Sequence, residues 1–149
     1  MKLPLMLPAL ATALLLGLAP AVAYSQSKPA QAQQAKRQNI VLQVSDADPA
    51  KWNLALNNAE NVQQALGKDK VTVEIVAYGP GIDMLKAESK VADRLNGAMD
   101  RNVALIACAA SMQKAKVSEA DLAGGVKVVP GGVIHIMQRQ REGWAYVRP

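Results

Sequence analysis

Short runs of β-branched and aliphatic residues alternate with helical patterns along the chain, and this alternation restricts the possible folds more than any other feature. Five of the runs have the length and composition of strands. They cover residues 39–44, 71–78, 103–107, 126–129 and 144–148. Each gap between them is long enough for a crossover between parallel strands, but the spacing does not give the order of the strands in a sheet.

Helical patterns fill these gaps. Asp48 and Pro49 form an N-cap followed by a proline in the first turn, and apolar residues then recur every three or four positions until Gly67. Strands joined by helices predict an α/β fold: a flavodoxin-like, doubly wound, mainly parallel five-stranded sheet with helices on both faces. The further helices are expected over 82–100, with a break near Ser89, over 109–116 and over 133–143.

The first part of the chain has the composition of an export signal. Lys2 precedes an apolar stretch interrupted by three prolines, and the small residues 21–23 follow it directly. This pattern indicates a signal peptide cleaved near Ala23, and the prolines argue against a retained membrane span. We therefore expect a signal peptide over 1–23, a flexible polar tail over 24–38 and one α/β domain over 39–149, in a periplasmic protein.

Charge and composition disfavour several classes of function. Without its leader the chain has 16 basic and 12 acidic residues, because Lys2 is the only charged residue among the first 23. These charges are dispersed and aromatic residues are few, so we expect no nucleic-acid partner. The glycine pairs 124–125 and 131–132 match no dinucleotide or phosphate-binding motif, and one cysteine with one histidine makes no metal-ligand set. We expect neither a cofactor nor a metal.

Cys108, the only cysteine, directly follows the run 103–107 and begins a short helical pattern. The carboxyl ends of parallel strands are where sites form in open α/β sheets. The free backbone N–H groups of Ala109 and Ala110 are expected to favour the thiolate, and the Ser111 hydroxyl is a further candidate donor. Cys108 is therefore the candidate reactive group.

Three other turns are expected at the same edge of the sheet, because each follows a strand. If they were close to the thiol, the Asp46 and Asp48 carboxylates would oppose thiolate formation. The candidate binding residues in these turns are Ser45, Asp46, Asp48, Tyr78, Gly79, Pro130 and Gly131.

A packing role for Cys108 is the alternative, since free cysteine is among the most buried residue types. An unpaired cysteine in an exported protein has three options: it stays buried, it pairs with another chain, or it reacts. His135 lies on an apolar stretch of helix and is expected to be structural.

Four segments together resemble the DsrE/DsrF-like family, in particular its short exported members with a closing tryptophan-containing strand. The segments are VLQVSDADPAKWNLALNNAENVQ, VEIVAYGPGIDML, VALIACAASM and GGVIHIMQRQREGWAYVRP. The resemblance spans residues 38–149 and implies a flavodoxin-like fold and a homo-oligomer such as a trimer or hexamer. In sulfur-relay branches it also implies a cysteine at the Cys108 position that carries sulfane sulfur as a persulfide.

The leading functional hypothesis is a periplasmic sulfur carrier or sulfurtransferase-like protein that uses Cys108, with a sulfur donor or acceptor protein as partner. The alternative is a non-catalytic oligomeric module that binds a small ligand or a protein, with Cys108 only lining the cleft. A redox-responsive dimer joined through Cys108 is a third reading.

Overall fold

The computed structural model describes residues 38–149, so the expected signal peptide and the expected tail, apart from Gln38, lie outside the described residues. Within the described part, no helix is long and apolar enough to cross a membrane. The strands are β1 (Gln38–Val44), β2 (Val71–Ala77), β3 (Val103–Cys108), β4 (Lys127–Val129) and β5 (Ala145–Val147). The helices are α1 (Pro49–Leu66), η1 (Gly79–Leu85), α2 (Ala92–Asp100), α3 (Ala109–Ala115), η2 (Glu119–Asp121) and α4 (Gly132–Arg141), where η marks a 3-10 helix.

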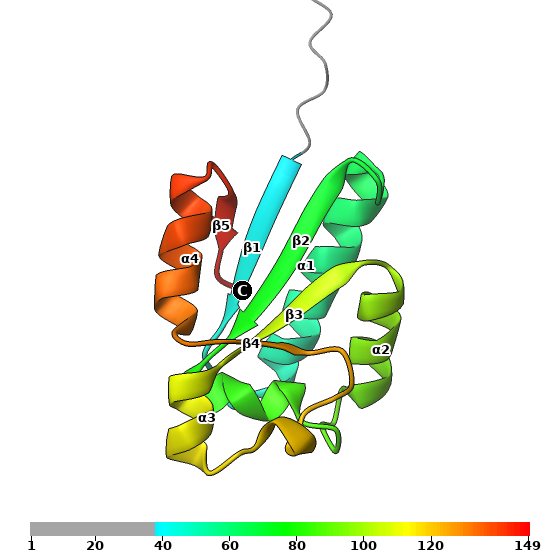
Figure 1. Ribbon diagram of the computed structural model, residues 1–149. Coiled ribbons are helices and arrows are strands. Elements are labelled where there is room, and N and C mark those ends of the chain that lie inside the picture. The colour runs from blue at the N-terminus through cyan, green and yellow to red at the C-terminus, as the bar shows by residue number, and fades with distance from the viewer. Residues whose placement is uncertain (1–37) are drawn as a thin grey trace, which may run out of the picture. The chain divides into compact units, whose positions relative to one another are not determined.

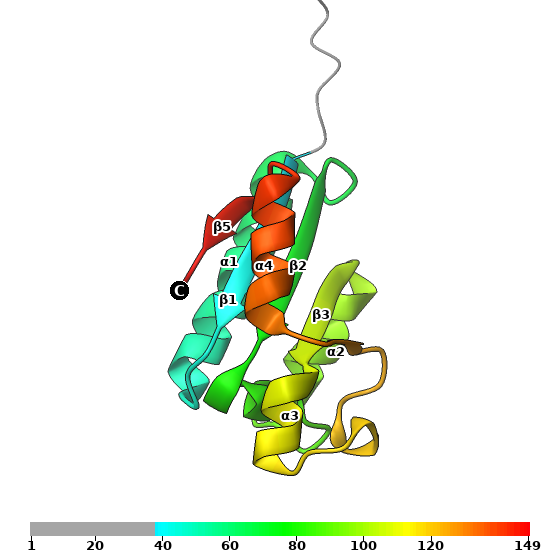
Figure 2. The same cartoon turned by 60° about the vertical axis from the view of Figure 1, so that its left-hand side comes forward.

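The five strands form one sheet in the order β4-β3-β2-β1-β5, and every neighbouring pair is parallel. The helices α1 and α2 lie on one face of this sheet, and α4 covers the other face (Figures 1 and 2). The predicted doubly wound α/β fold is confirmed. Gln38, which we expected in the tail, is instead the first residue of β1.

The two faces of the sheet follow from alternation along the strands. On β3, for example, Leu105 belongs to a large apolar cluster under α1 and α2, whereas the next residue, Ile106, belongs to a small one under α4. On β2 the same alternation places Ile75 in the large cluster and Val76 in the small one. The two faces are therefore unequal in apolar content.

The helical region after β2 has the break that was expected near Ser89, and the break separates the 3-10 helix η1 from α2. The break extends from the end of η1 to the start of α2, and it contains Lys86, which forms an antiparallel bridge with Leu122. Two backbone hydrogen bonds flank this bridge: Ala87 N–H donates to Asp121 O and Ala123 N–H donates to Leu85 O, both at 2.9 Å. These long-range bonds hold the segment extended, which local periodicity alone does not predict.

Candidate functional site

Cys108 is the last residue of β3 and occupies the N-cap position of α3. The residue is 5% exposed. Its strand pairs with β4 so that Cys108 lies opposite Val129, and this register brings the chain entering α4 alongside the thiol. The site therefore lies where β3 and β4 end, although these strands continue into different helices.

Gly132, the first residue of α4, packs directly against this position. A Cβ atom on Gly132 would lie 3.2 Å from Cys108 Cβ and 3.1 Å from Tyr78 Cβ. A side chain at this position would press on Cys108 and Tyr78, so the glycine lets α4 begin this close to the thiol without displacing them. The sequence pattern indicates Gly131 but not Gly132 as a site residue, because the contact depends on β4 being the neighbour of β3.

Several groups around the sulfur change its acidity. Burial raises the pKa of Cys108. Hydrogen bonding from the Ser111 hydroxyl and from the N–H groups of Gly132, Ser111 and Ala110 lowers the pKa, and these bonds together outweigh burial, so the pKa lies below the ordinary value of a cysteine. The Cys108 side chain makes no regular cap hydrogen bond in the structure. These donors therefore act chiefly by favouring the thiolate.

The predicted role of Ala109 as a backbone donor is not supported. Among the described residues, the donors that act on the sulfur include Ala110 and Ser111 but not Ala109. The reason is geometric: an N-cap side chain is approached by the N–H groups of the second and third helical residues, and Ala109 is the first.

Ser111 has two contacts that together orient its hydroxyl. Its Oγ accepts a hydrogen bond of 2.7 Å from the backbone N–H of Gly79, and its own proton is then free to point at the Cys108 sulfur. Gly79 has a φ of +53°, a conformation that side chains disfavour. The turn after β2 is therefore coupled to the thiol through Ser111.

The expected binding residues separate into two groups. Tyr78 and Gly79 lie beside the thiol through the contacts with Gly132 and Ser111. Gly131 is the N-cap of α4, directly before Gly132, and the exposed Pro130 precedes it. These four residues share the edge with Cys108, as expected from the strand ends.

The turn after β1 does not join the site. Asp48 caps α1 by accepting a hydrogen bond from Ala50 N–H at 2.8 Å. Asp46 lies 3.6 Å from Lys51 and 3.5 Å from Arg148, and its neighbour Ser45 donates to it at 3.4 Å. None of the three affects the thiol pKa, since β1 is separated from β3 by β2.

A cluster of ionisable side chains beneath α4 was not predicted from the sequence. The Glu74 carboxylate contacts the His135 ring and the Arg139 guanidinium. The signal available was a single charged residue inside the apolar strand VTVEIVA, combined with two basic side chains four residues apart on a helix. The expectation that His135 is structural agrees with this contact.

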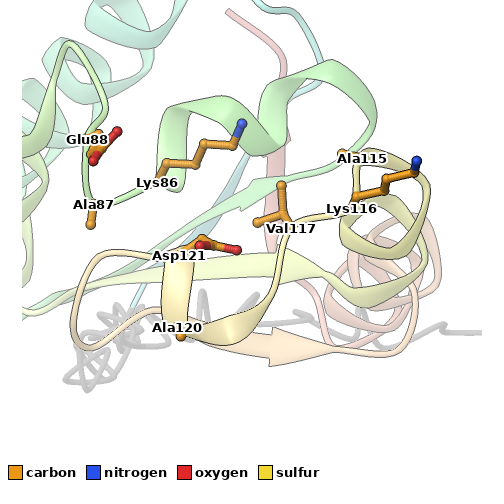
Figure 3. A pocket seen from close by; sticks show the side chains of 8 residues that line it. All are labelled: Lys86, Ala87, Glu88, Ala115, Lys116, Val117, Ala120 and Asp121. Atoms are coloured by element: carbon orange, nitrogen blue, oxygen red, sulfur yellow. The ribbon is translucent and has the colours of Figure 1, made fainter.

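Two surface cavities lie near the carboxyl end of the sheet. One, of about 500 Å³, is lined by Tyr78, Gly79, Pro80, Ser111, Lys114 and Ala115, and thus shares three residues with the surroundings of the thiol. The other, of about 410 Å³, lies between the segment after η1 and the segment linking α3 to η2 (Figure 3). Its lining carries both signs of charge, from Lys86, Lys116, Glu88 and Asp121, and does not include Cys108.

Side chains that could bind a metal ion are scattered in the described part of the chain. Residues 38–149 contain no group of three or more histidine, cysteine, aspartate or glutamate side chains placed to hold an ion. The arrangement at Cys108 instead favours a thiolate supported by neutral donors, which is suited to nucleophilic attack.

Comparisons with known proteins agree with this fold. The chain is similar to a solved protein of unknown function, MTH1491 from Methanobacterium thermoautotrophicum, at 32% identity and a TM-score of 0.72, covering 75% of this chain and 99% of that one. It shares its fold with BT1422 of Bacteroides thetaiotaomicron, also of unknown function, at 11% identity, a TM-score of 0.63 and coverage of 78% and 98%. It likewise shares its fold with ychN of E. coli, at 15% identity, a TM-score of 0.62 and coverage of 75% and 99%.

No curated protein matches the chain. The model of the DsrE/DsrF-like family matches residues 38–149, which is the whole described domain. Membership of this family indicates a role related to sulfur relay. The chain belongs to the DsrE/DsrF-like family.

Proposed function

We propose that this protein is a periplasmic sulfur carrier or sulfurtransferase-like protein in which Cys108 bears a persulfide. The observation that carries the proposal is the set of donors around the sulfur, namely the Ser111 hydroxyl and the N–H groups of Ala110, Ser111 and Gly132, which lower the pKa of the thiol. The same donors favour the persulfide anion, because it too carries negative charge at sulfur.

The reaction is a thiol exchange on sulfane sulfur. The Cys108 thiolate attacks a sulfane sulfur of a polysulfide, a new S–S bond forms, and the old S–S bond breaks with the shortened polysulfide leaving with the electron pair. With thiosulfate as donor, sulfite leaves instead. In the return step an acceptor thiolate attacks the outer sulfur and Cys108 leaves as thiolate, so no external oxidant or reductant is needed.

The low exposure of Cys108 favours a small donor. With the whole residue only 5% exposed, Cys108 offers little surface to a protein partner in the isolated chain. The cavity of about 500 Å³ shares Ser111 with the thiol environment and brings the Lys114 side chain to its wall. A cationic side chain there suits an anionic sulfur compound.

The proposal includes export to the periplasm, supported by the signal-peptide pattern of residues 1–23. Protein recovered from the periplasmic fraction is expected to have the intact mass of a chain that begins near Tyr24. Recovery of the uncleaved chain from the cytoplasm contradicts this part of the proposal.

The proposal also includes a homo-oligomer, such as a trimer or hexamer. Among the described residues, three of the five large exposed apolar side chains lie on α4: Val133 at 51%, Ile134 at 57% and Met137 at 45% exposed. Neighbouring apolar side chains of this kind on one helix are typical of an interface. Light scattering is expected to give a mass of several chains, and Ile134→Glu to reduce it.

The decisive experiment is sulfur loading followed by intact mass. Exposure of the purified protein to polysulfide is expected to add the mass of sulfur atoms, and Cys108→Ala is expected to abolish the addition. Ser111→Ala, which retains the thiol but removes its hydroxyl donor, is expected to load more slowly at neutral pH. Equal loading of the protein and Cys108→Ala contradicts the proposal.

A second candidate is a non-catalytic module that binds a ligand or protein at the same edge. The observation in its favour is the burial of Cys108, together with a cavity whose lining does not include it. This function predicts slow alkylation of Cys108 with the pH dependence of an ordinary thiol and no sulfur adduct. A redox dimer joined through Cys108 is distinguished by non-reducing electrophoresis.

A further inference from the structure

A carboxylate is buried at the centre of the sheet, on the face covered by α4. Glu74 lies in the middle of β2, paired with Val41 on β1 and Ala104 on β3, and it is 6% exposed. The apolar residues buried around it on this face include Val41, Val76 and Ile106. A carboxylate in such surroundings requires partners, because its desolvation is costly.

Both partners come from α4. His135 Nε2 lies 2.8 Å from Glu74 Oε2, and because a carboxylate only accepts, this nitrogen carries the proton. Arg139 donates from Nε to Oε2 at 2.9 Å and from Nη2 to Oε1 at 2.8 Å. The guanidinium is held further by Glu142, at 2.9 Å, and by the Trp144 ring, whose centre lies 4.6 Å away.

This charged cluster accounts for much of the attachment of α4 to the sheet. Gly132 and Ile136 are the only buried residues of this helix. Apolar packing is non-directional, whereas two parallel hydrogen bonds from a guanidinium to a carboxylate define one position. The cluster therefore sets where along β2 the helix lies.

The cluster also lies one helical turn along α4 from the residue that contacts the thiol, Gly132. His135 N–H donates to Gly131 O at 3.0 Å, in the first turn of α4, and Gly132 follows Gly131. Gly132 is in close contact with Cys108 and Tyr78, and its N–H acts on the sulfur. A shift of α4 along the sheet moves this N–H relative to the sulfur.

We propose that Glu74, His135 and Arg139 are positioning residues for Cys108, which fix α4 on β2 so that the Gly132 N–H faces the sulfur. The inference deepens the proposed function, because it assigns the residues that maintain the environment of the proposed sulfur-carrying thiol. None of the three touches the sulfur or its substrate.

The direction of the effect separates positioning from direct electrostatics. Glu74→Gln removes a negative charge from the domain, and a purely Coulombic effect of that loss lowers the pKa of Cys108. Loss of the Gly132 donor raises it instead. Glu74→Gln is therefore the informative variant, since the two mechanisms predict opposite signs.

The experiment measures the rate of Cys108 alkylation against pH in the purified protein before any sulfur is added. Glu74→Gln and His135→Gln are expected to move the profile to higher pH and to slow alkylation near pH 7 by about three- to tenfold, as for a shift of about half to one pH unit. Arg139→Lys retains the charge but not the paired hydrogen bonds, and is expected to give a smaller shift in the same direction.

The matched control is Gln63→Ala. Gln63 is buried and donates from Nε2 to Arg101 O at 2.7 Å, at the opposite end of the sheet from Cys108. This variant is expected to lower the melting temperature but to leave the alkylation profile in place. It therefore separates loss of stability from loss of positioning.

Folded Glu74→Gln and His135→Gln proteins with unchanged profiles, or with profiles at lower pH, overturn the inference. If Glu74→Gln does not give a cooperative melting transition, His135→Gln decides the outcome. Sulfur loading is scored separately: a protein that never loads but shows these shifts contradicts the proposed function alone. A protein that loads normally without these shifts contradicts the positioning role alone.

Discussion

The two faces of the sheet are built from different interactions. Under α1 and α2, a large cluster of apolar side chains includes fully buried residues such as Leu42, Ile75 and Leu105. Under α4, the buried apolar residues are few, and they surround the Glu74 carboxylate with its partners on the helix. One face is held by apolar burial and the other largely by directed polar contacts.

This difference shows how stability and geometry can be separated within one small domain. Apolar burial supplies most of the free energy of folding but tolerates small displacements. Charged hydrogen bonds contribute less net free energy but specify one arrangement. Cys108 lies at the border of the two regions, since it packs with the large cluster and faces Gly132 at the start of α4.

The largest effect is expected from a pair of substitutions on adjacent residues of β3. Leu105→Ala removes a side chain from the large cluster and is expected to lower the free energy of unfolding by about 4 kcal/mol. Ile106→Ala acts on the α4 face and is expected to cost about 2 kcal/mol, because fewer apolar neighbours are lost there. Urea denaturation measures both, and equal losses contradict the contrast between the faces.

Gly132→Ala is expected to lower the stability less than the two β3 substitutions do, but to change the reactivity of the Cys108 thiol more. The new methyl group would lie 3.2 Å from Cys108 Cβ and 3.1 Å from Tyr78 Cβ, so the start of α4 and these side chains are expected to shift apart. The pKa of Cys108 is expected to rise, with alkylation near pH 7 slowed by about tenfold. Gly124→Ala is the control, because a methyl group there meets no atom within 4 Å. The contrast fails if both variants alkylate at the same rate.

The smallest effect concerns the dependence of stability on pH. The pKa of Cys108 is lower in the folded protein than in the unfolded chain, where it is about 8.5. Ionisation of the thiol therefore stabilises the folded protein fully at pH values above about 8.5. This stabilisation disappears as the pH falls through the pKa that Cys108 has in the folded protein. The melting temperature of the protein relative to Cys108→Ser is therefore expected to be higher at about pH 9.5 than at about pH 6. A constant difference contradicts the lowered pKa.

Much of the fold could be predicted because its signals are local. The β-branched runs and the capped helix after Asp48 are properties of neighbouring residues, and the position of Cys108 at a strand end follows from them. A break near Ser89 was predicted, but its extent over residues 86–91 was not, since backbone bonds from a segment more than 30 residues later decide it. Local sequence patterns therefore predict the elements but not the boundaries that long-range hydrogen bonds decide.

The site was predicted where it depends on chain neighbours of Cys108 or on the edge at which the strands end, as for Tyr78 and Gly79. Ser111 and Ala110 act on the sulfur because they follow Cys108 in the same helix. Gly132 was missed because its contact with the thiol depends on strand order, which spacing does not reveal, and the position of Glu74 beneath α4 was missed for the same reason. Because the strand order was not known from the sequence, Asp46 and Asp48 were included among the candidate site residues. In the structure, β2 separates their strand, β1, from β3.

The bridge between Lys86 and Leu122 has a consequence for the segment that links α3 to β4. With the hydrogen bonds of Ala87 and Ala123 on either side, the bridge ties the middle of this segment to the end of η1. The segment therefore opens only when the domain opens around it. In deuterium exchange, the Ala123 amide will retain its proton far longer than an amide in an unattached surface loop of the same length.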